Sequence, residues 1–313
     1  MIILVGTSNM AIDYAKVLKK QNLDFMVVGR GKTNAEKFEE LTGIKPLLGG
    51  VEGIDCDFIE SRSITKAIVA TGVETLASVS SHLISVGVKD LLVEKPGAID
   101  VEQLETLLNK METFYSNIYI AYNRRFYASV AKAREIIRED GQVVNFHFEL
   151  TEWGHVIKDV QKDESVKDNW FFANTTHVVD LAFHLGGAPS QLASFTTGSS
   201  EWHERSYVYA GAGVSNSGAL FSYSGNWGGP GRWSVEVLTS KHRLIFRPME
   251  KLQIQEVGSI EQRFVDIDDS IDIEFKPGLF KQVEAFLSGD VEYLCPLSEQ
   301  VAHAKLYKKM ANY

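Results

Sequence analysis

The sequence predicts an α/β protein in which a doubly wound parallel sheet precedes an α/β domain with a large, open, mainly antiparallel sheet. Three observations carry this prediction. The chain has 313 residues, of which 44% are hydrophobic and 23% charged, an ordinary globular composition at a length typical of about two domains. Short apolar runs alternate with helical patterns up to Tyr122, as in a parallel sheet with helical crossovers. Beyond Tyr122, alternating segments joined by Gly, Ser and Asn turns favour an antiparallel sheet.

The first part of the chain is expected to supply the strands of the parallel sheet. Each predicted strand is a short apolar run of the kind found where both faces of a sheet are buried. These runs occupy residues 1–5, 25–28, 66–70, 90–93 and 118–122. Helical spacing of apolar residues predicts helices around residues 10–18 and over 35–41, 74–86 and 101–114.

The second part begins with an amphipathic helix over residues 127–138 and continues mostly as strands. The predicted strands are residues 143–150, 206–212, 219–223, 233–238, 243–247 and 252–257. Further helices are expected over residues 176–185, 278–287 and 298–312. We therefore predict one boundary, with residues 1–122 in a first domain and residues 123–313 in a second.

Charge and composition exclude several classes of protein. Acidic residues outnumber Lys and Arg by 41 to 32, and the net charge of −9 argues against a broad nucleic-acid surface. The two cysteines, Cys56 and Cys295, lie far apart and form no metal-ligand motif. No stretch reaches the roughly 18 apolar residues of a membrane span, and the start of the chain lacks the basic region of a signal peptide. We expect a cytoplasmic protein that binds neither nucleic acid nor membrane.

The turn after the first predicted strand reads Gly6-Thr7-Ser8-Asn9-Met10-Ala11. Compared with the G-x-G-x-x-G/A pattern of dinucleotide-binding turns, it keeps the first glycine and has an accepted alanine at the last place. Serine at the second place is a departure, because glycine there lets the backbone approach a pyrophosphate. Residues 6–10 are candidate cofactor contacts, although an ordinary tight turn explains this segment equally well by itself.

The end of the second predicted strand reads Gly29-Arg30-Gly31-Lys32-Thr33. NAD sites usually place Asp or Glu about 20 residues after the first glycine, to accept from the ribose 2′-hydroxyl. This segment has no acid and two cations, and charge-assisted donors suit a 2′-phosphate. We predict NADP binding by Gly29, Arg30, Lys32 and Thr33, with NAD as the alternative. Solvated surface charge is the plain structural explanation.

The segment Glu94-Lys95-Pro96 stands at the end of a later predicted strand. A lysine at the carboxyl end of such a strand is placed to polarise a carbonyl or to exchange a proton with a hydroxyl. Proline fixes the backbone there and can adopt the cis form. The structural alternative is a simple turn at the end of the strand.

Several segments also occur together in a recognisable order and spacing. After the glycine turn come Ala70-Thr71-Gly72, Glu94-Lys95-Pro96, Tyr122-Asn123-Arg124-Arg125-Phe126 and His177-Val178-Val179-Asp180-Leu181. In these segments, and along essentially its whole length, the chain resembles the glucose–fructose oxidoreductase / inositol dehydrogenase / MocA (Gfo/Idh/MocA) family. The resemblance implies a Rossmann domain followed by an α/β domain whose open sheet forms the interface of a homodimer or homotetramer.

The resemblance further implies hydride transfer between NAD(P) and the hydroxyl or ketone of a small-molecule substrate, a sugar, nucleotide sugar or polyol. Lys95 matches the motif lysine, and His177 matches the histidine that commonly serves with it as proton donor or acceptor. Thr71, Gly72 and the segment Glu94-Lys95-Pro96 are implied cofactor contacts.

The substrate contacts implied by position are Lys95, Asn123, Arg124, Asn174, His177 and Asp180. Asn123 and Arg124 are equally compatible with bracing the junction between domains. Many family members carry an aspartate four residues before the histidine, where this sequence has Ala173. A Lys–Asp–His relay is therefore in doubt, whereas a Lys95–His177 pair with Asn174 orienting substrate remains.

Two other functions stay open at this point. Related folds reduce C=N or C=C bonds, as imine and enone reductases do, and some relatives bind a dinucleotide only to regulate a partner. No metal site is expected, because His177 and His184 do not have the i, i+4 spacing of a zinc pair. The acidic stretch at residues 266–272 lacks the spacing of a calcium loop.

Overall fold

The computed structural model describes all 313 residues and divides the chain into two compact units. The first unit contains Met1–Asn123 and Glu274–Ala302, and the second contains Arg124–Ile273 and His303–Tyr313. The boundary predicted from the sequence corresponds to the first crossing between them, and the return of residues 274–302 to the first unit was not expected. No helix is long and apolar enough to span a membrane.

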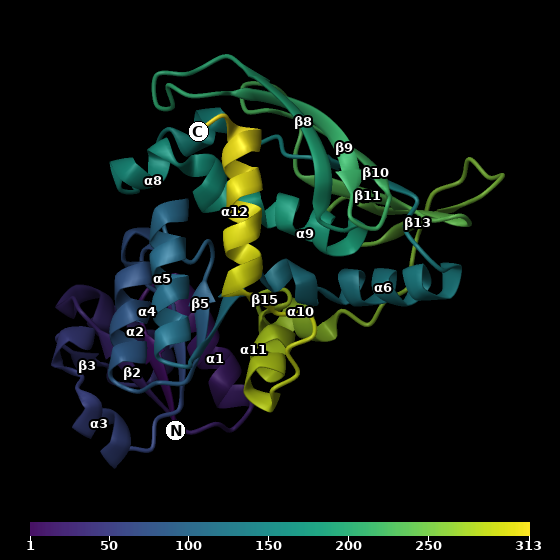
Figure 1. The fold of residues 1–313 in the computed structure, drawn as a ribbon. Coiled ribbons are helices and arrows are strands. Elements are labelled where there is room, and N and C mark those ends of the chain that lie inside the picture. Colours follow the sequence, from purple (N-terminus) through teal and green to yellow (C-terminus); the bar gives the residue numbers. More distant parts are fainter. The chain divides into compact units, whose positions relative to one another are not determined.

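A seven-stranded sheet carries the first unit (Figure 1). Its strands are β1 (Ile2–Val5), β2 (Phe25–Gly29), β3 (Leu47–Leu48), β4 (Lys66–Val69), β5 (Asp90–Glu94), β6 (Asn117–Ala121) and β15 (Cys295–Pro296). They lie in the order β15-β6-β5-β4-β1-β2-β3, and all neighbours are parallel except β15 and β6. The strand order reverses between β1 and β4, which creates a topological switch point. The predicted doubly wound parallel sheet is confirmed.

Helices cover this sheet along its crossovers (Figure 1). They are α1 (Asn9–Lys20), α2 (Lys32–Thr42), α3 (Cys56–Ser61), α4 (Leu76–Ser85), α5 (Val101–Thr113) and α11 (Leu279–Ser288), with 3-10 turns at Val51–Gly53 and Val73–Thr75. α1 packs with α2 and α11, whereas α4 packs with α5. Leu4 of β1 and Ile68 of β4 have no exposed surface, as expected for parallel strands covered on both faces.

The second unit contains an eight-stranded sheet in the order β14-β13-β12-β11-β7-β10-β9-β8 (Figure 1). Its strands are β7 (Asn145–Glu149), β8 (Pro189–Thr197), β9 (Val208–Ser215), β10 (Leu220–Asn226), β11 (Ser234–Leu238), β12 (His242–Phe246), β13 (Gln253–Glu256) and β14 (Arg263–Phe264). Every neighbouring pair is antiparallel except β7 and β10. The predicted mainly antiparallel sheet is confirmed.

The helices of the second unit lie mostly on one face of this sheet. They are α6 (Ala128–Asp140), α7 (Gly154–Ile157), α8 (Glu164–Asp168), a π-helix (Phe171–Thr175) and α9 (Thr176–Gly186). The 3-10 turn Asn123–Phe126, α10 (Ser270–Glu274) and α12 (Leu297–Ala311) each include residues of both units.

One face of the second sheet is covered and the other is open. α9 packs across β7 and β11, and its Phe183 makes edge-on ring contacts with Phe146, Phe148 and Phe221. Exposed and buried residues alternate along the whole of β10. Such alternation is typical of an antiparallel sheet with one solvated face.

The sequence did not predict β8, and it placed residues 278–287 in the second domain. β8 has few large apolar residues and none of its side chains is buried, so its alternating pattern is weak. The segment that contains α11 belongs to the first unit because α11 packs on α1 and because Cys295 of β15 pairs with Ile120 of β6. Contacts between segments so distant in sequence leave no local pattern.

Candidate functional site

A cavity of about 340 Å³ lies beyond the carboxyl ends of β1, β2 and β4. Val5, Val28 and Ala70, which end or follow these strands, contribute to its lining. This is the switch point of the sheet, where open α/β folds bind their ligands. The predicted cofactor residues that line the cavity are Gly6, Thr7, Ser8, Arg30, Thr71 and Gly72.

Gly6 turns the chain out of β1 at the edge of this cavity. Its φ is +125°, and a Cβ added here would stand 2.3 Å from the carbonyl oxygen of Ala70. Residues with a side chain rarely adopt such a φ, and the close approach leaves no room for one. The first glycine of the turn is therefore required by the backbone itself.

Ser8 occupies the place where the dinucleotide-binding pattern has its second glycine. Its hydroxyl oxygen accepts from the backbone N–H of Ala11 at 3.4 Å, which caps the N-terminus of α1. The same hydroxyl donates to the carbonyl oxygen of Ala70 at 3.1 Å. The serine side chain is thus held by the protein, so this departure from the pattern is compatible with a ligand at the turn.

The residues present fit a dinucleotide. α1 begins directly after the glycine turn and has no acidic residue in its first turn, so its N-terminus favours a phosphate. The hydroxyl of Thr71, which lines the cavity, is buried and has no hydrogen-bond partner in the protein. A polar ligand would satisfy this group.

The charged residues at the β2 end of the cavity differ from those expected. Arg30 lines the cavity, whereas the side chain of Lys32 is 79% exposed and lies 3.8 Å from Glu36. Glu52, which the sequence did not indicate, also lines the cavity. A Cβ added to Gly50 would lie 2.3 Å from Oε2 of Glu52 and 3.8 Å from Cβ of Arg30, so the carboxylate covers Gly50 close to Arg30. Glu52 was missed because it follows β3 rather than β2.

Seven other predicted cofactor residues do not line the cavity, namely Asn9, Met10, Gly29, Thr33, Glu94, Lys95 and Pro96. Asn9 and Thr33 are exposed at the starts of α1 and α2. Met10 instead contacts the ammonium group of a lysine before α11. Gly29 has a packing role, because a Cβ there would lie 2.6 Å from Cγ2 of Thr7.

Glu94, Lys95 and Pro96 close the carboxyl end of β5. The fully buried Tyr14 donates its hydroxyl to Oε1 of Glu94 at 2.8 Å. Burial raises the pKa of Glu94, against the opposing effects of this hydrogen bond and of nearby lysine charges. The Lys95–Pro96 peptide is cis, and the carbonyl oxygen of Pro96 accepts from Nε2 of Gln300 at 2.9 Å. Lys95 therefore stands on a segment that is hydrogen-bonded on both sides.

The second unit presents two candidate side chains on one helical face. Between Phe171 and Phe183 every residue is buried except Asn174 and His177. They are three residues apart, at the end of the π-helix and in the first turn of α9. π-Helical turns are frequently found at functional sites. Lys95 belongs to the first unit and His177 to the second.

Glu152 is a carboxylate behind this face that the sequence did not indicate. It is 1% exposed and accepts from Nε1 of Trp170 at 3.0 Å, from Nδ2 of Asn174 at 2.7 Å and from the hydroxyl of Thr175. Burial raises the pKa of Glu152, whereas these hydrogen bonds and the charge of Arg232 lower it. A carboxylate that accepts from Nδ2 of Asn174 leaves Oδ1 of that amide as an acceptor.

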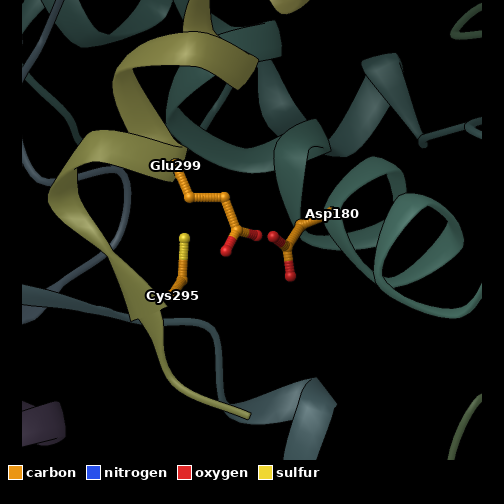
Figure 2. A group of neighbouring side chains, drawn as sticks. All are labelled: Asp180, Cys295 and Glu299. Atoms are coloured by element: carbon orange, nitrogen blue, oxygen red, sulfur yellow. The ribbon is translucent and has the colours of Figure 1, made fainter. Parts of the chain in front are cut away.

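Asp180 does not offer a free carboxylate to a substrate. It has no exposed surface, and its two oxygens accept from Nε and Nη2 of Arg125 at 2.9 and 2.5 Å. Figure 2 shows Asp180 projecting from α9, and also draws Cys295 of β15 and Glu299 of α12. The structure therefore favours a packing role for Asp180 in place of the expected substrate contact.

Asn123 and His184 are also held by neighbouring groups. Asn123 is 5% exposed and donates from Nδ2 to the carbonyl oxygen of Pro277 at 2.8 Å, within the first unit. Nε2 of His184 lies 3.3 Å from Nη1 of Arg134, and burial, assisted by two arginine charges, holds the pKa of His184 well below its usual range. Both residues are placed to brace their own unit.

Trp233 gathers polar side chains of the second unit around its indole ring. The guanidinium carbon of Arg124 lies 5.0 Å from the ring centroid, and the His177 ring lies 6.1 Å away. Arg232 approaches the same ring to 5.1 Å. By contrast, Trp227 is 1% exposed and donates from Nε1 to the carbonyl oxygen of Leu150, so it belongs to the core.

A scan against protein-family models gave no match, and a search of curated proteins gave none. Solved structures do match. UDP-N-acetylglucosamine 3-dehydrogenase GnnA from Acidithiobacillus ferrooxidans is 13% identical with a TM-score of 0.75, covering 99% of this chain and 96% of that one. Levoglucosan dehydrogenase in complex with NADH is 16% identical with a TM-score of 0.78, covering 99% and 95%. An oxidoreductase from Agrobacterium radiobacter in complex with NAD+, L-tartaric acid and magnesium is 12% identical with a TM-score of 0.75, covering 98% and 94%.

Similarity at these identities establishes the fold alone. Along nearly its whole length, this chain shares the fold of these dehydrogenases and oxidoreductases.

Proposed function

We propose that the protein is an NAD(P)-dependent oxidoreductase that interconverts a hydroxyl and a ketone on a sugar, nucleotide sugar or polyol. The cavity at the switch point, with its glycine turn at Gly6, is the observation that carries this proposal. Similar solved structures include sugar and nucleotide-sugar dehydrogenases, two of the reported proteins being complexes with NADH or NAD+, which supports the same function.

The cofactor would supply a hydride acceptor or donor at its nicotinamide. The Gly6–Ser8 turn and the N-terminus of α1 would hold its pyrophosphate, and Arg30 and Glu52 would lie on the side of the cavity that receives the adenosine ribose. Lys95, through Nζ, and His177, through its imidazole, act as donor or acceptor of the proton of the reacting hydroxyl. Asn174 orients the substrate. In the oxidation direction the carbinol carbon would give a hydride to the oxidised nicotinamide, and its hydroxyl would give a proton to Lys95 or His177, which leaves a neutral ketone.

NADP is the proposed cofactor, with Arg30 donating to the 2′-phosphate. Glu52 opposes this preference, because its carboxylate lines the same cavity as Arg30 and would repel a phosphate. We expect NADPH to bind more tightly than NADH. The difference in affinity depends on attraction of the 2′-phosphate by Arg30 and its repulsion by Glu52.

The preference is tested by titrating NADPH and NADH with both single variants. Arg30→Ala should weaken NADPH binding by roughly tenfold or more and leave NADH binding nearly unchanged. Glu52→Gln should strengthen NADPH binding, because it removes a negative charge without changing the shape of the side chain. Equal affinities for both cofactors in the wild type would contradict the NADP proposal while leaving a dinucleotide site in place.

The function itself is tested by nicotinamide fluorescence against a panel of sugars, nucleotide sugars and polyols. Lys95→Ala should lower kcat/KM by roughly 10² to 10⁴ and retain dinucleotide binding, because the lysine acts on the substrate proton. Lys16→Ala, an exposed lysine on α1, is the matched control and should keep full activity. Full activity of Lys95→Ala would remove this residue from the mechanism. Dinucleotide binding without turnover of any compound would favour a regulator.

The open face of the second sheet supports self-association. Strand register places Phe195 of β8, Ala210 of β9 and Ser224 of β10 in one row, and Leu220 lies on the same face. Phe195 is 70% exposed and Leu220 is 62% exposed. Large apolar side chains exposed on the open face of a sheet are compatible with an interaction site, and we propose that this face forms a homodimer or homotetramer interface.

A further inference from the structure

We infer that the substrate is a hydroxylated anion, whose negative group is received by Arg124 and Arg232 beside Trp233. This inference rests on the proposed function and narrows its substrate class. It concerns one face of the second unit, formed by Arg124, Asn174, His177, Arg232 and Trp233, which we call the Trp233 face.

Two cations are held at this face by aromatic rings. The guanidinium carbons of Arg124 and Arg232 lie 5.0 and 5.1 Å from the centroid of Trp233. Arg232 also lies 4.9 Å from the ring of Trp153, whose Nε1 donates to the carbonyl oxygen of Gly231 at 3.1 Å. Stacking on aromatic rings orients a guanidinium without using its N–H donors.

Neither arginine forms an ion pair with a carboxylate of the protein, in contrast to Arg125, Arg243, Arg247 and Arg263. The nearby acids are already engaged. Glu149 pairs with Arg247 at 2.7 Å, and Glu152 is buried behind the face with three hydrogen-bond donors. The Trp233 face therefore carries two positive charges whose planar donor groups suit a carboxylate or phosphate.

The same face offers groups for hydroxyl recognition. Oδ1 of Asn174 accepts from no group of the protein, because its amide nitrogen is the atom turned toward Glu152. Trp233 is 7% exposed, and its buried Nε1 has no hydrogen-bond partner. The indole nitrogen of Trp202 is buried without a partner in the same way, so this donor is not counted toward ligand binding. The amide oxygen of Asn174 and the two cations together suit a substrate with both hydroxyl and anionic groups.

Carboxylate and phosphate are the two sources of such a charge. A sugar acid carries the first, and the diphosphate of a nucleotide sugar carries the second. Bidentate donation from a guanidinium fits either one, so matched ligands must distinguish them.

The experiment is calorimetric titration of the full chain saturated with dinucleotide. The probes are uronic and aldonic acids with their neutral parent sugars, and UDP-sugars with the corresponding free sugars. We expect one anionic series to bind at least tenfold more tightly than its neutral partners. Binding confined to the sugar acids identifies a carboxylate, and binding confined to the UDP-sugars identifies a phosphate.

Variants of Arg232 then test whether the tighter binding of anions depends on the Trp233 face. Arg232→Ala should weaken binding of the preferred anion by roughly tenfold to a hundredfold and leave the neutral sugars unchanged. Arg232→Lys should recover part of the loss, because it keeps the charge without the planar fork. Arg138→Ala, an exposed arginine on α6, is the control and should bind like the wild type.

Three results would overturn the inference: neutral sugars binding as tightly as anions, no anion binding, or Arg232→Ala without effect on the anion. Dinucleotide binding is measured first by fluorescence quenching in the same samples. A wild type that does not bind dinucleotide would count against the proposed function. A wild type that binds dinucleotide but prefers neutral sugars to anions would count only against the inference.

Discussion

At the scale of single residues, Glu152 is the feature that most changes the candidate substrate site. The sequence offers no acid four residues before His177, where Ala173 stands. The structure supplies a buried carboxylate from another segment, and this carboxylate holds Asn174 and Thr175 rather than the histidine. Its role is to set the direction of the Asn174 amide, so it acts through that residue.

Substitutions of Glu152 should separate its shape from its charge. In Glu152→Gln the amide oxygen can accept from Trp170 and Asn174, while the amide nitrogen donates to the hydroxyl of Thr175, which can also accept. We expect its free energy of unfolding at pH 7 to stay within about 1 kcal/mol of the wild type. Glu152→Ala removes the acceptor of three donors and should lose about 3 kcal/mol or more, measured by urea denaturation.

The charge of Glu152 also predicts a pH dependence. Because burial raises the pKa of Glu152 above the ordinary value of 4.5, the folded state binds its proton more readily than the unfolded state. Its contribution to stability therefore falls as pH rises from about 4.5 through the folded pKa. Glu152→Gln should flatten this part of the stability profile, and an unchanged slope in that variant would contradict the assignment.

At the scale of elements, the Arg125–Asp180 ion pair joins the 3-10 turn Asn123–Phe126 to α9. Arg125 is 2% exposed and Asp180 has no exposed surface, so both charges of this pair are buried. Asp180→Asn should cost about 3–5 kcal/mol of unfolding free energy, because it removes the carboxylate charge that pairs with a buried guanidinium. The double variant Arg125→Met, Asp180→Leu should lose less than the single one. A larger loss in the double variant would show that packing, and not charge, dominates here.

Elements also show how far local pattern extends. α9 was predicted over residues 176–185 and spans Thr176–Gly186, because its apolar residues recur at helical spacing. The π-helix directly before it had no sequence signal, since its irregular turn depends on what surrounds Phe171–Thr175. The N–H of Phe171 donates to the hydroxyl of Tyr313 at 3.1 Å, a contact between residues far apart in the chain.

At the scale of the whole molecule, the proposed self-association through the open sheet face can be measured directly. Phe195→Glu places a charge on a side chain that is 70% exposed in the isolated chain, and should raise the dissociation constant by roughly thirtyfold or more. Light scattering over a concentration series measures this change. Ile260→Glu, which alters an apolar residue outside the sheet that is 98% exposed, is the control. A wild type that is monomeric at every concentration would contradict the interface.

The sequence by itself determined the alternation of strands and helices, the antiparallel second sheet and the position of the glycine turn. These are local properties. The spacing of apolar residues and the glycine turn at Gly6 both involve residues that are close together in the sequence. It also indicated Arg30, which lines the cavity, and Asn174 and His177, which are half-buried and share one helical face.

Only the tertiary structure decided which charges meet. Glu52 lines the cavity because β3 pairs with β2. Lys32 is exposed to solvent beside Glu36, and Asp180 forms an ion pair with Arg125. Each outcome depends on contacts between segments that are separate in sequence. Electrostatic roles depend on distance and burial, and neither can be read from a linear order of residues.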